Sequence, residues 1–147
     1  MKQIPGTWFE CKVRYEQTQE DGMNKMVTET YVYKAADFGE AYDKAIKNMS
    51  TFISGEFDIT AMKIARYKEI ITQDKRTEER YYRVKVNLII LDEKTQKEKK
   101  TACYYLVNAD SVEKARKYTD TAFSDTLIDY VIEAVQEAKI IDVIFDD

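Results

Sequence analysis

Two stretches decide the fold, KAADFGEAYDK at residues 34–44 and VNADSVEKARK at residues 107–117. Both carry Ala-Asp, then Glu, then Lys in the same relative positions. A shift of 73 residues without a gap aligns residues 7–71 with residues 80–144, with identities spread along both segments. This pattern predicts an internal duplication, and the alternative is a chance similarity of two strand–helix patterns.

Each copy opens with two segments that alternate between apolar and polar residues, as strands do. The second of these strands is expected to point Tyr31 and Tyr33 inward in the first copy, and Tyr104 and Leu106 inward in the second. The segments 57–71 and 130–144 end the copies and favour strand, with helix as the alternative for the second segment.

The repeated stretch itself predicts the start of a helix in each copy. Asp37 and Asp110 are placed as N-caps, and each has a glutamate three residues further on, as in a capping box. Apolar residues recur behind both caps at helical spacing.

The predicted fold class is therefore α+β, with two tandem ββαβ repeats in pseudo-twofold symmetry and helices packed on one face of an antiparallel sheet. One domain spans residues 1–147, with repeat 1 at 7–71 and repeat 2 at 80–144. Each unit becomes ββαββ if the last segment bends, in the first copy near Ala65.

The amino-acid composition argues against several classes of protein, among them metalloproteins and membrane-spanning proteins. The chain of 147 residues has no histidine, a net charge of −4 and two cysteines, Cys11 and Cys103, without a CxxC partner. It has no glycine-rich loop and no apolar run of the roughly 18 residues that span a membrane. We therefore expect a cytoplasmic protein that is not an enzyme, with no catalytic residues, no cofactor and no metal.

Aromatic and basic side chains share the outward face of the first strand in each copy. Aromatic rings stack on bases and cations neutralise phosphates, so this face predicts binding of single-stranded DNA, or less readily RNA. The alternative is an ordinary solvated sheet face. The predicted binding residues are Trp8, Lys12, Arg14, Tyr81, Arg83 and Lys85, with Lys97, Lys99 and Lys100 as electrostatic support.

The charges are unevenly distributed along the chain. Residues 75–117 are basic on balance, whereas residues 120–147 hold one lysine against eight acids. This asymmetry favours a basic binding surface beside an acidic end, and the alternative is a loop kept soluble by its lysines. The final DVIFDD is either an acidic tail that recruits partners or a last strand with a polar end.

Residues 7–45, TWFECKVRYEQTQEDGMNKMVTETYVYKAADFGEAYDKA, followed by FISGEF, resemble an uncharacterised family of Bacteroidetes and their phages, including crAss-like phages. LDEKTQKEKKTA and DYVIEAV are similar to the second halves of its members, and Thr30 departs from the proline expected there. The resemblance implies no agreed activity but a cytoplasmic role near replication or nucleic-acid handling. The rival hypothesis is a protein-interaction adaptor or inhibitor without a nucleic-acid ligand. A homo-oligomer or a protein partner stays open, and a membrane is not expected.

Overall fold

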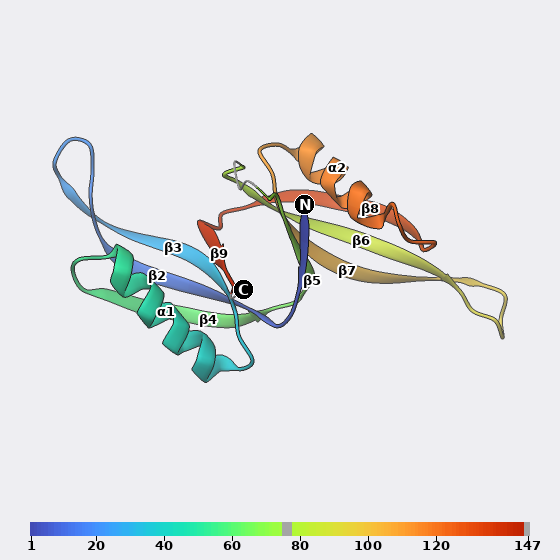
Figure 1. Cartoon of the computed structure of the whole chain (residues 1–147), viewed down its shortest axis with the longest axis horizontal. Coiled ribbons are helices and arrows are strands. Elements are labelled where there is room, and N and C mark those ends of the chain that lie inside the picture. The colour runs from blue at the N-terminus through green and yellow to red at the C-terminus, as the bar shows by residue number, and fades with distance from the viewer. Residues whose placement is uncertain (75–77, 146–147) are drawn as a thin grey trace. The chain divides into compact units, whose positions relative to one another are not determined.

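The computed structural model describes residues 1–74 and 78–145, which contain nine strands and two helices (Figure 1). In chain order these are β1 Lys2–Pro5, β2 Trp8–Thr18, β3 Asn24–Lys34, α1 Phe38–Phe52, β4 Phe57–Ala65, β5 Tyr67–Thr72, β6 Tyr81–Leu91, β7 Glu98–Asn108, α2 Val112–Phe123, β8 Asp129–Ala138 and β9 Asp142–Ile144. They form two compact units. The β2 unit comprises Gly6–Arg66 and the segment from Lys139 on, and the β6 unit comprises Met1–Pro5 and Tyr67–Ala138.

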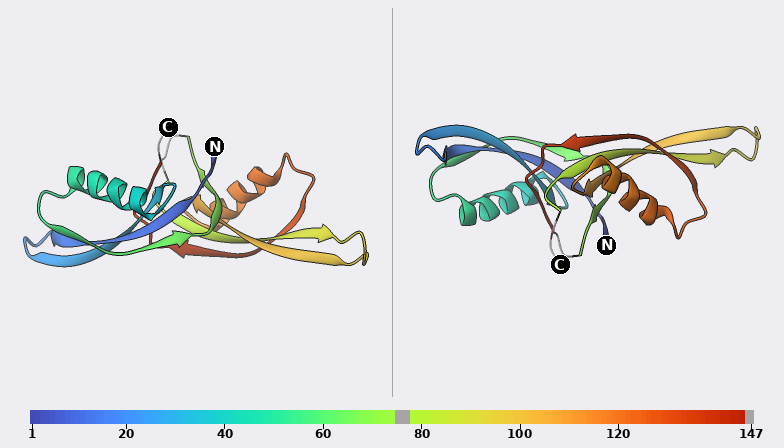
Figure 2. Two further views of the ribbon diagram at one scale, coloured as in Figure 1. Left: turned by 90° about the horizontal axis from the view of Figure 1, so that it is seen from below. Right: turned by 90° about the horizontal axis from the view of Figure 1, so that it is seen from above.

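The β2 unit is built on the long antiparallel hairpin of β2 and β3, within a sheet of order β4-β2-β3-β9. The hairpin turns at Gly22, whose φ of 83° is a conformation that glycine adopts without steric cost. α1 lies along one face of the sheet (Figure 2) because the strand residues that alternate toward that face are apolar. The main buried residues of this core are Cys11, Val13, Tyr33, Ala45 and Met49.

The β6 unit has a sheet of order β1-β5-β7-β6-β8, with α2 along one face (Figure 2). Between α2 and the sheet, the ring of Phe123 meets Tyr105 edge to face, with ring centroids 5.6 Å apart. Phe123 also stacks on Tyr130 at 4.3 Å. Val84 and Val86 complete the centre of this core. Each unit therefore has an apolar core between its own helix and its own sheet.

The last strand of each predicted repeat belongs to the unit built from the other repeat. β5 follows β4 in the chain but pairs in parallel with β7 of the β6 unit. β9 follows β8 but pairs in parallel with β3 of the β2 unit. The chain passes from one unit to the other three times, between Pro5 and Gly6, between Arg66 and Tyr67, and between Ala138 and Lys139.

The predicted fold class was wrong. The described residues form two sheets with nine strands, each sheet has its own helix, and each contains a parallel pair, so two tandem ββαβ repeats on one antiparallel sheet do not describe the chain. The long segment 57–71 is interrupted at Arg66 and gives β4 and β5, and the segment 130–144 gives most of β8 and all of β9. The backbone groups of β5 and β9 form hydrogen bonds with strands that are distant in sequence. The alternation of residues within a segment cannot reveal such pairing.

The helix caps also differ from the predicted pair. The Asp37 carboxylate accepts a hydrogen bond from the backbone N–H three residues further on, at 2.8 Å, and begins α1 as predicted. α2 begins at Ser111, whose hydroxyl accepts the equivalent bond at 3.1 Å. Asp110 instead accepts a hydrogen bond from the backbone N–H of Glu79. The prediction for Asp110 was therefore wrong by one residue.

The register of the hairpins explains this offset. Trp8 lies opposite Lys34, and Tyr81 lies opposite Asn108. The first strands thus correspond at an offset of 73 residues, but the second strands and the helices correspond at an offset of 74. An alignment without a gap therefore assigned β7 to the wrong face.

The inward residues of β7 follow from this register. Tyr31 and Tyr33 face the core beneath α1, as predicted. In β7 the core residues include Tyr105 and Val107, so alternation places Tyr104 and Leu106 on the opposite face. The prediction that Tyr104 points inward was therefore wrong. Leu106 is fully buried, but on the face opposite α2.

Several smaller expectations concern the ends and the thiols. Cys11 and Cys103 are both free. Among the described residues, neither helix has the length and apolarity that a membrane crossing requires. The final strand β9 is present, whereas the two acids of the expected tail, at 146 and 147, lie outside the described residues, as do residues 75–77 between the two predicted repeats.

Candidate nucleic-acid interface

Each sheet has one face covered by its helix and a second face on which the described chain places no helix, called here the helix-free face (Figure 2). In β2, Cys11 and Val13 pack beneath α1, so alternation puts Lys12 and Arg14 on the helix-free face. In β6, Val84 packs beneath α2 and its neighbours Arg83 and Lys85 point the other way. The four predicted cations of these strands therefore lie on helix-free faces, two in each unit.

The two predicted aromatic residues are buried. Trp8 and Tyr81 begin β2 and β6 on the helix-free faces, yet their exposed fractions are 0% and 3%. The indole nitrogen of Trp8 is itself buried and has no hydrogen-bond partner among the described residues. Stacking of a base on either ring would require the surrounding side chains to move.

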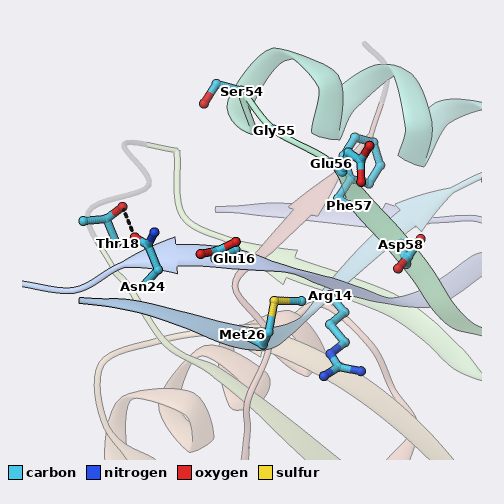
Figure 3. Close-up of a pocket in the computed structure, with 10 residues that line it drawn as sticks. All are labelled: Arg14, Glu16, Thr18, Asn24, Met26, Ser54, Gly55, Glu56, Phe57 and Asp58. Carbon is cyan, nitrogen blue, oxygen red and sulfur yellow. Dashed lines mark hydrogen bonds between the residues drawn. The ribbon is translucent and has the colours of Figure 1, made fainter. Parts of the chain in front are cut away.

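Lys12 and Arg14 are exposed, but acidic residues lie near Arg14 at the end of the helix-free face that is close to the β2–β3 turn. An open pocket of about 460 Å³ lies there, and Figure 3 shows the side chain of Arg14 pointing away from Glu56 and Asp58. The lining residues are Arg14, Glu16, Thr18, Asn24, Met26, Ser54, Gly55, Glu56, Phe57 and Asp58. Three carboxylates against one guanidinium disfavour a phosphate backbone at this end of the β2 unit.

Arg83 and Lys85 are held in place by specific partners. Arg83 Nε donates a hydrogen bond to the hydroxyl of Tyr67 at 2.8 Å. Lys85 Nζ lies 3.0 Å from Glu133 Oε2, which also accepts a hydrogen bond from Asn87 Nδ2 at 2.9 Å. The bonds from Lys85, the largest cause, and from Asn87 lower the pKa of Glu133, and the bond to Glu133 raises the pKa of Lys85. Both groups remain ionised near neutral pH.

The three lysines expected to give electrostatic support are exposed in the β6–β7 hairpin. Lys97 lies in the turn before β7, Lys99 pairs across the hairpin with Ile90, and Lys100 pairs with Ile89. Alternation along β7 puts Lys100 on the helix-free face and Lys99 on the opposite face. One of the three therefore shares a face with Arg83 and Lys85.

Tyr104 is the residue that sequence reasoning missed. It lies directly opposite Lys85 on the helix-free face of the β6 unit, and the residue is 41% exposed. Lys100 lies four residues earlier on the same face of β7. The signal in the sequence was the adjacent pair Tyr104-Tyr105, in which one ring must face each side of the strand. The sheet thus places a half-exposed aromatic ring among three cations, Arg83, Lys85 and Lys100.

Within residues 1–74 and 78–145, no group of three or more His, Cys, Asp or Glu side chains could hold a metal ion. Burial raises the pKa of the Cys11 thiol to about 11, which leaves it protonated and a poor nucleophile near neutral pH. The arrangement of Tyr104 and its cations suits binding, because a ring and fixed positive charges need no proton transfer to act.

A family model described as a domain of unknown function (DUF4494) matches residues 7–146. No curated protein and no solved structure matches the chain.

Proposed function

We propose that this chain, which belongs to the DUF4494 family, is a non-enzymatic protein that binds single-stranded DNA across the helix-free face of the β6 unit. The observation that carries the proposal is the half-exposed ring of Tyr104 opposite Lys85, with Lys100 on the same face. A base stacks on the ring, and the lysines neutralise the phosphates on either side of it.

Single-stranded nucleic acid fits this face better than duplex does. Bases of a duplex are stacked on one another and offer no free face to Tyr104, whereas those of a single strand can turn onto the ring. The net charge of −4 also disfavours the dense phosphate contacts that duplex binding needs. The resemblance to proteins of Bacteroidetes and their phages supports a role in replication or nucleic-acid handling in the cytoplasm.

Titration of a fluorescently labelled oligothymidylate with the full chain tests this function. We expect fluorescence anisotropy to rise with protein at low salt, and the affinity to fall as salt is added, because bound phosphates release their counterions. An unlabelled duplex of equal length should compete less well than the single strand. No anisotropy change with micromolar protein at low salt would contradict the proposal.

An adaptor or inhibitor that binds another protein is the second candidate. It is favoured by exposed apolar side chains on the outer side of α1, including Phe38 and Tyr42. Capture of a defined protein partner that tolerates salt, together with a negative oligonucleotide titration, would support this candidate over DNA binding.

A further inference from the structure

α1 carries exposed apolar side chains along the side that the core does not use. Phe38, Tyr42 and Ile46 follow one another at intervals of four residues and are 49%, 48% and 36% exposed. On the other side of the helix, Lys44 donates a hydrogen bond to the backbone of β3, and Asn48 accepts one from a β3 tyrosine. The exposed side of α1 therefore faces β4.

β4 continues this apolar surface onto the sheet. Ile64 of β4 is 44% exposed and lies opposite Phe9 of β2. The ring of Phe9 contacts Phe38 of α1 edge to face, with centroids 5.0 Å apart. The four side chains Phe38, Tyr42, Ile46 and Ile64 form one surface, called here the α1–β4 flank.

The β6 unit provides an internal comparison, because the same architecture keeps only one apolar residue of this surface, the half-exposed Val112 at the position of Phe38. At the offset of 74 in the helix, Arg116 and Asp120 replace Tyr42 and Ile46. At the offset of 73 in the strand, the exposed Glu137 replaces Ile64. The fold therefore does not require apolar residues at these positions, and their presence in the β2 unit needs another explanation.

The edge of β4 is compatible with pairing to itself. Within the described part of the chain, β4 pairs with β2 alone and is an edge strand. If two copies of β4 pair antiparallel about an axis between Thr60 and Ala61, Asp58 of each copy lies opposite Lys63 of the other. These two side chains share the helix-free side, because their neighbours on β2 are Arg14 and Glu10. The same register brings apolar residues opposite one another on the helix side. Those apolar pairs are Phe57 with Ile64 and Ile59 with Met62.

We propose that the β2 unit binds a second copy of this chain, through antiparallel pairing of the two β4 strands and contact between the two α1–β4 flanks. The four half-exposed side chains offer roughly 350 Å² of apolar surface per copy. That is close to half of the roughly 800 Å² that each partner buries in a standard interface. The remainder comes from the strand backbone and from the two Asp58–Lys63 pairs, and the twofold axis makes each contact occur twice.

The corresponding edge strand of the β6 unit, β8, does not have these features. Its residues corresponding to Asp58 and Lys63 are Val131 and Gln136, so the same register would bring no opposite charges together. Both strands carry a bulge at the same place, so the bulge belongs to the shared architecture and does not explain the difference. Self-association through β4 is independent of the nucleic-acid function, because the Tyr104 face belongs to the β6 unit.

Sedimentation equilibrium of the full chain without nucleic acid tests the proposal. We expect a mass of two chains, and self-association weakened roughly tenfold or more in Tyr42→Arg and in Ile46→Asp. Both variants introduce the residue that α2 carries at the corresponding position, so the helix should tolerate them, which circular dichroism checks. Gln136→Lys on β8 is the matched control and should leave the mass unchanged. A mass of one chain at all micromolar concentrations, or a dimer that Tyr42→Arg does not weaken, would overturn the proposal.

Charge reversal tests the register separately. Asp58→Lys and Lys63→Asp should each weaken the dimer, because each puts like charges opposite one another twice. The double variant Asp58→Lys/Lys63→Asp should restore it. Lys63 Nζ also lies 3.5 Å from Glu10 Oε2 of its own chain, so circular dichroism must show that the variants with Lys63→Asp keep their fold. If the double variant is as weak as the single variants while Tyr42→Arg also abolishes the dimer, the antiparallel β4 register is wrong.

Discussion

Lys85 of β6 lies directly opposite Tyr104 of β7, whereas Lys12, at the corresponding place in the β2 unit, lies opposite Thr30. One extra residue in the second hairpin turn produces this difference, since it moves β7 by one position relative to β3. The two units therefore share an architecture but not a surface. The β6 unit combines an exposed ring with cations, and the β2 unit combines Lys12 and Arg14 with an acidic pocket.

Replacement of Tyr104 should separate stacking from charge. A stacked base contributes about 1–3 kcal/mol, so Tyr104→Ala should weaken oligothymidylate binding by roughly 5- to 150-fold, while Tyr104→Phe keeps the ring and most of the affinity. The measurement is the dissociation constant from anisotropy titration. Phe52→Ala removes an exposed ring of the β2 unit and serves as control. Equal losses in the Tyr104→Ala and Phe52→Ala variants would contradict a specific role for Tyr104.

Removing the partner of Lys85 should tighten binding. Glu133→Gln eliminates the negative charge that now lies 3.0 Å from Lys85 Nζ, so affinity for the single strand should rise and its salt dependence should steepen. Lys85→Gln should act in the opposite direction and lower the salt slope by about one phosphate contact. Lys117→Gln, an exposed lysine of α2, is the control. A Glu133→Gln variant that binds more weakly than the wild type would show that Glu133 supports the site instead of masking it.

The fluorescence of Trp8, the one tryptophan of the chain, should report a buried environment. We expect weak quenching by acrylamide and no change when oligothymidylate binds at Tyr104, because quencher and bases cannot reach the indole. Denatured protein gives the reference for full access. Strong quenching by the oligonucleotide alone would instead support the sequence-based prediction that a base stacks on Trp8.

The cap of α2 can be tested by stability. Ser111→Ala should lower the free energy of unfolding by about 1 kcal/mol, because it removes the hydroxyl that accepts a helix N–H. Ser111→Asp keeps an acceptor at the cap and should cost much less. The measurement is the midpoint of urea unfolding followed by circular dichroism. Equal midpoints for Ser111→Ala and the wild type would contradict a cap at Ser111 and support the sequence-based prediction of a cap at Asp110.

Tyrosine ionisation should destabilise the protein at alkaline pH. A hydrogen bond to Asp120 raises the pKa of Tyr130 to about 12, and burial, followed by a hydrogen bond to Glu29, raises the pKa of Tyr15 to about 12. The ordinary value is near 10. Because the folded pKa values are raised, their stabilising contribution is complete below about pH 10 and is lost as pH rises toward 12.

Spectrophotometric titration of tyrosinate checks this expectation. The folded chain should show a late-titrating group of tyrosines, and Tyr130→Phe should remove one member of it. Unfolding by urea at moderate pH should bring the group back toward 10. Titration of all tyrosines near 10 in the folded protein would contradict the hydrogen-bonded geometry of Tyr15 and Tyr130.

Local patterns in the sequence were enough to find most of the elements. Alternation located the strands β2 and β3 and the inward residues Tyr31 and Tyr33, and the capping pattern located the start of α1 at Asp37, since each depends on residues within a few positions. The pairing register of the second hairpin could not be predicted from local patterns. A gap-free alignment treats the turns before Asn24 and before Glu98 as equal in length, and this one-residue error moved Tyr104 to the core side.

The sheet to which β5 and β9 belong could not be predicted from local patterns either. β5 and β9 look like continuations of β4 and β8, and only pairing with distant strands shows where they belong. The candidate site was likewise predictable where it depends on alternation and unpredictable where it depends on tertiary packing. Alternation correctly separated Lys12, Arg14, Arg83 and Lys85 from the core residues of their strands, but it could not reveal the burial of Trp8 and Tyr81, which depends on tertiary packing.

The exchange of β5 and β9 has a consequence for synthesis on the ribosome. The sheet of the β2 unit cannot be completed before β9 is translated, and β9 follows every strand of the β6 unit in the chain. β1, which emerges before the other described strands, cannot pair until β5 has left the exit tunnel. Neither half of the gene therefore encodes a complete sheet, and a nascent chain that stalls between α2 and β8 would expose the unpaired edge of β3 to other polypeptides.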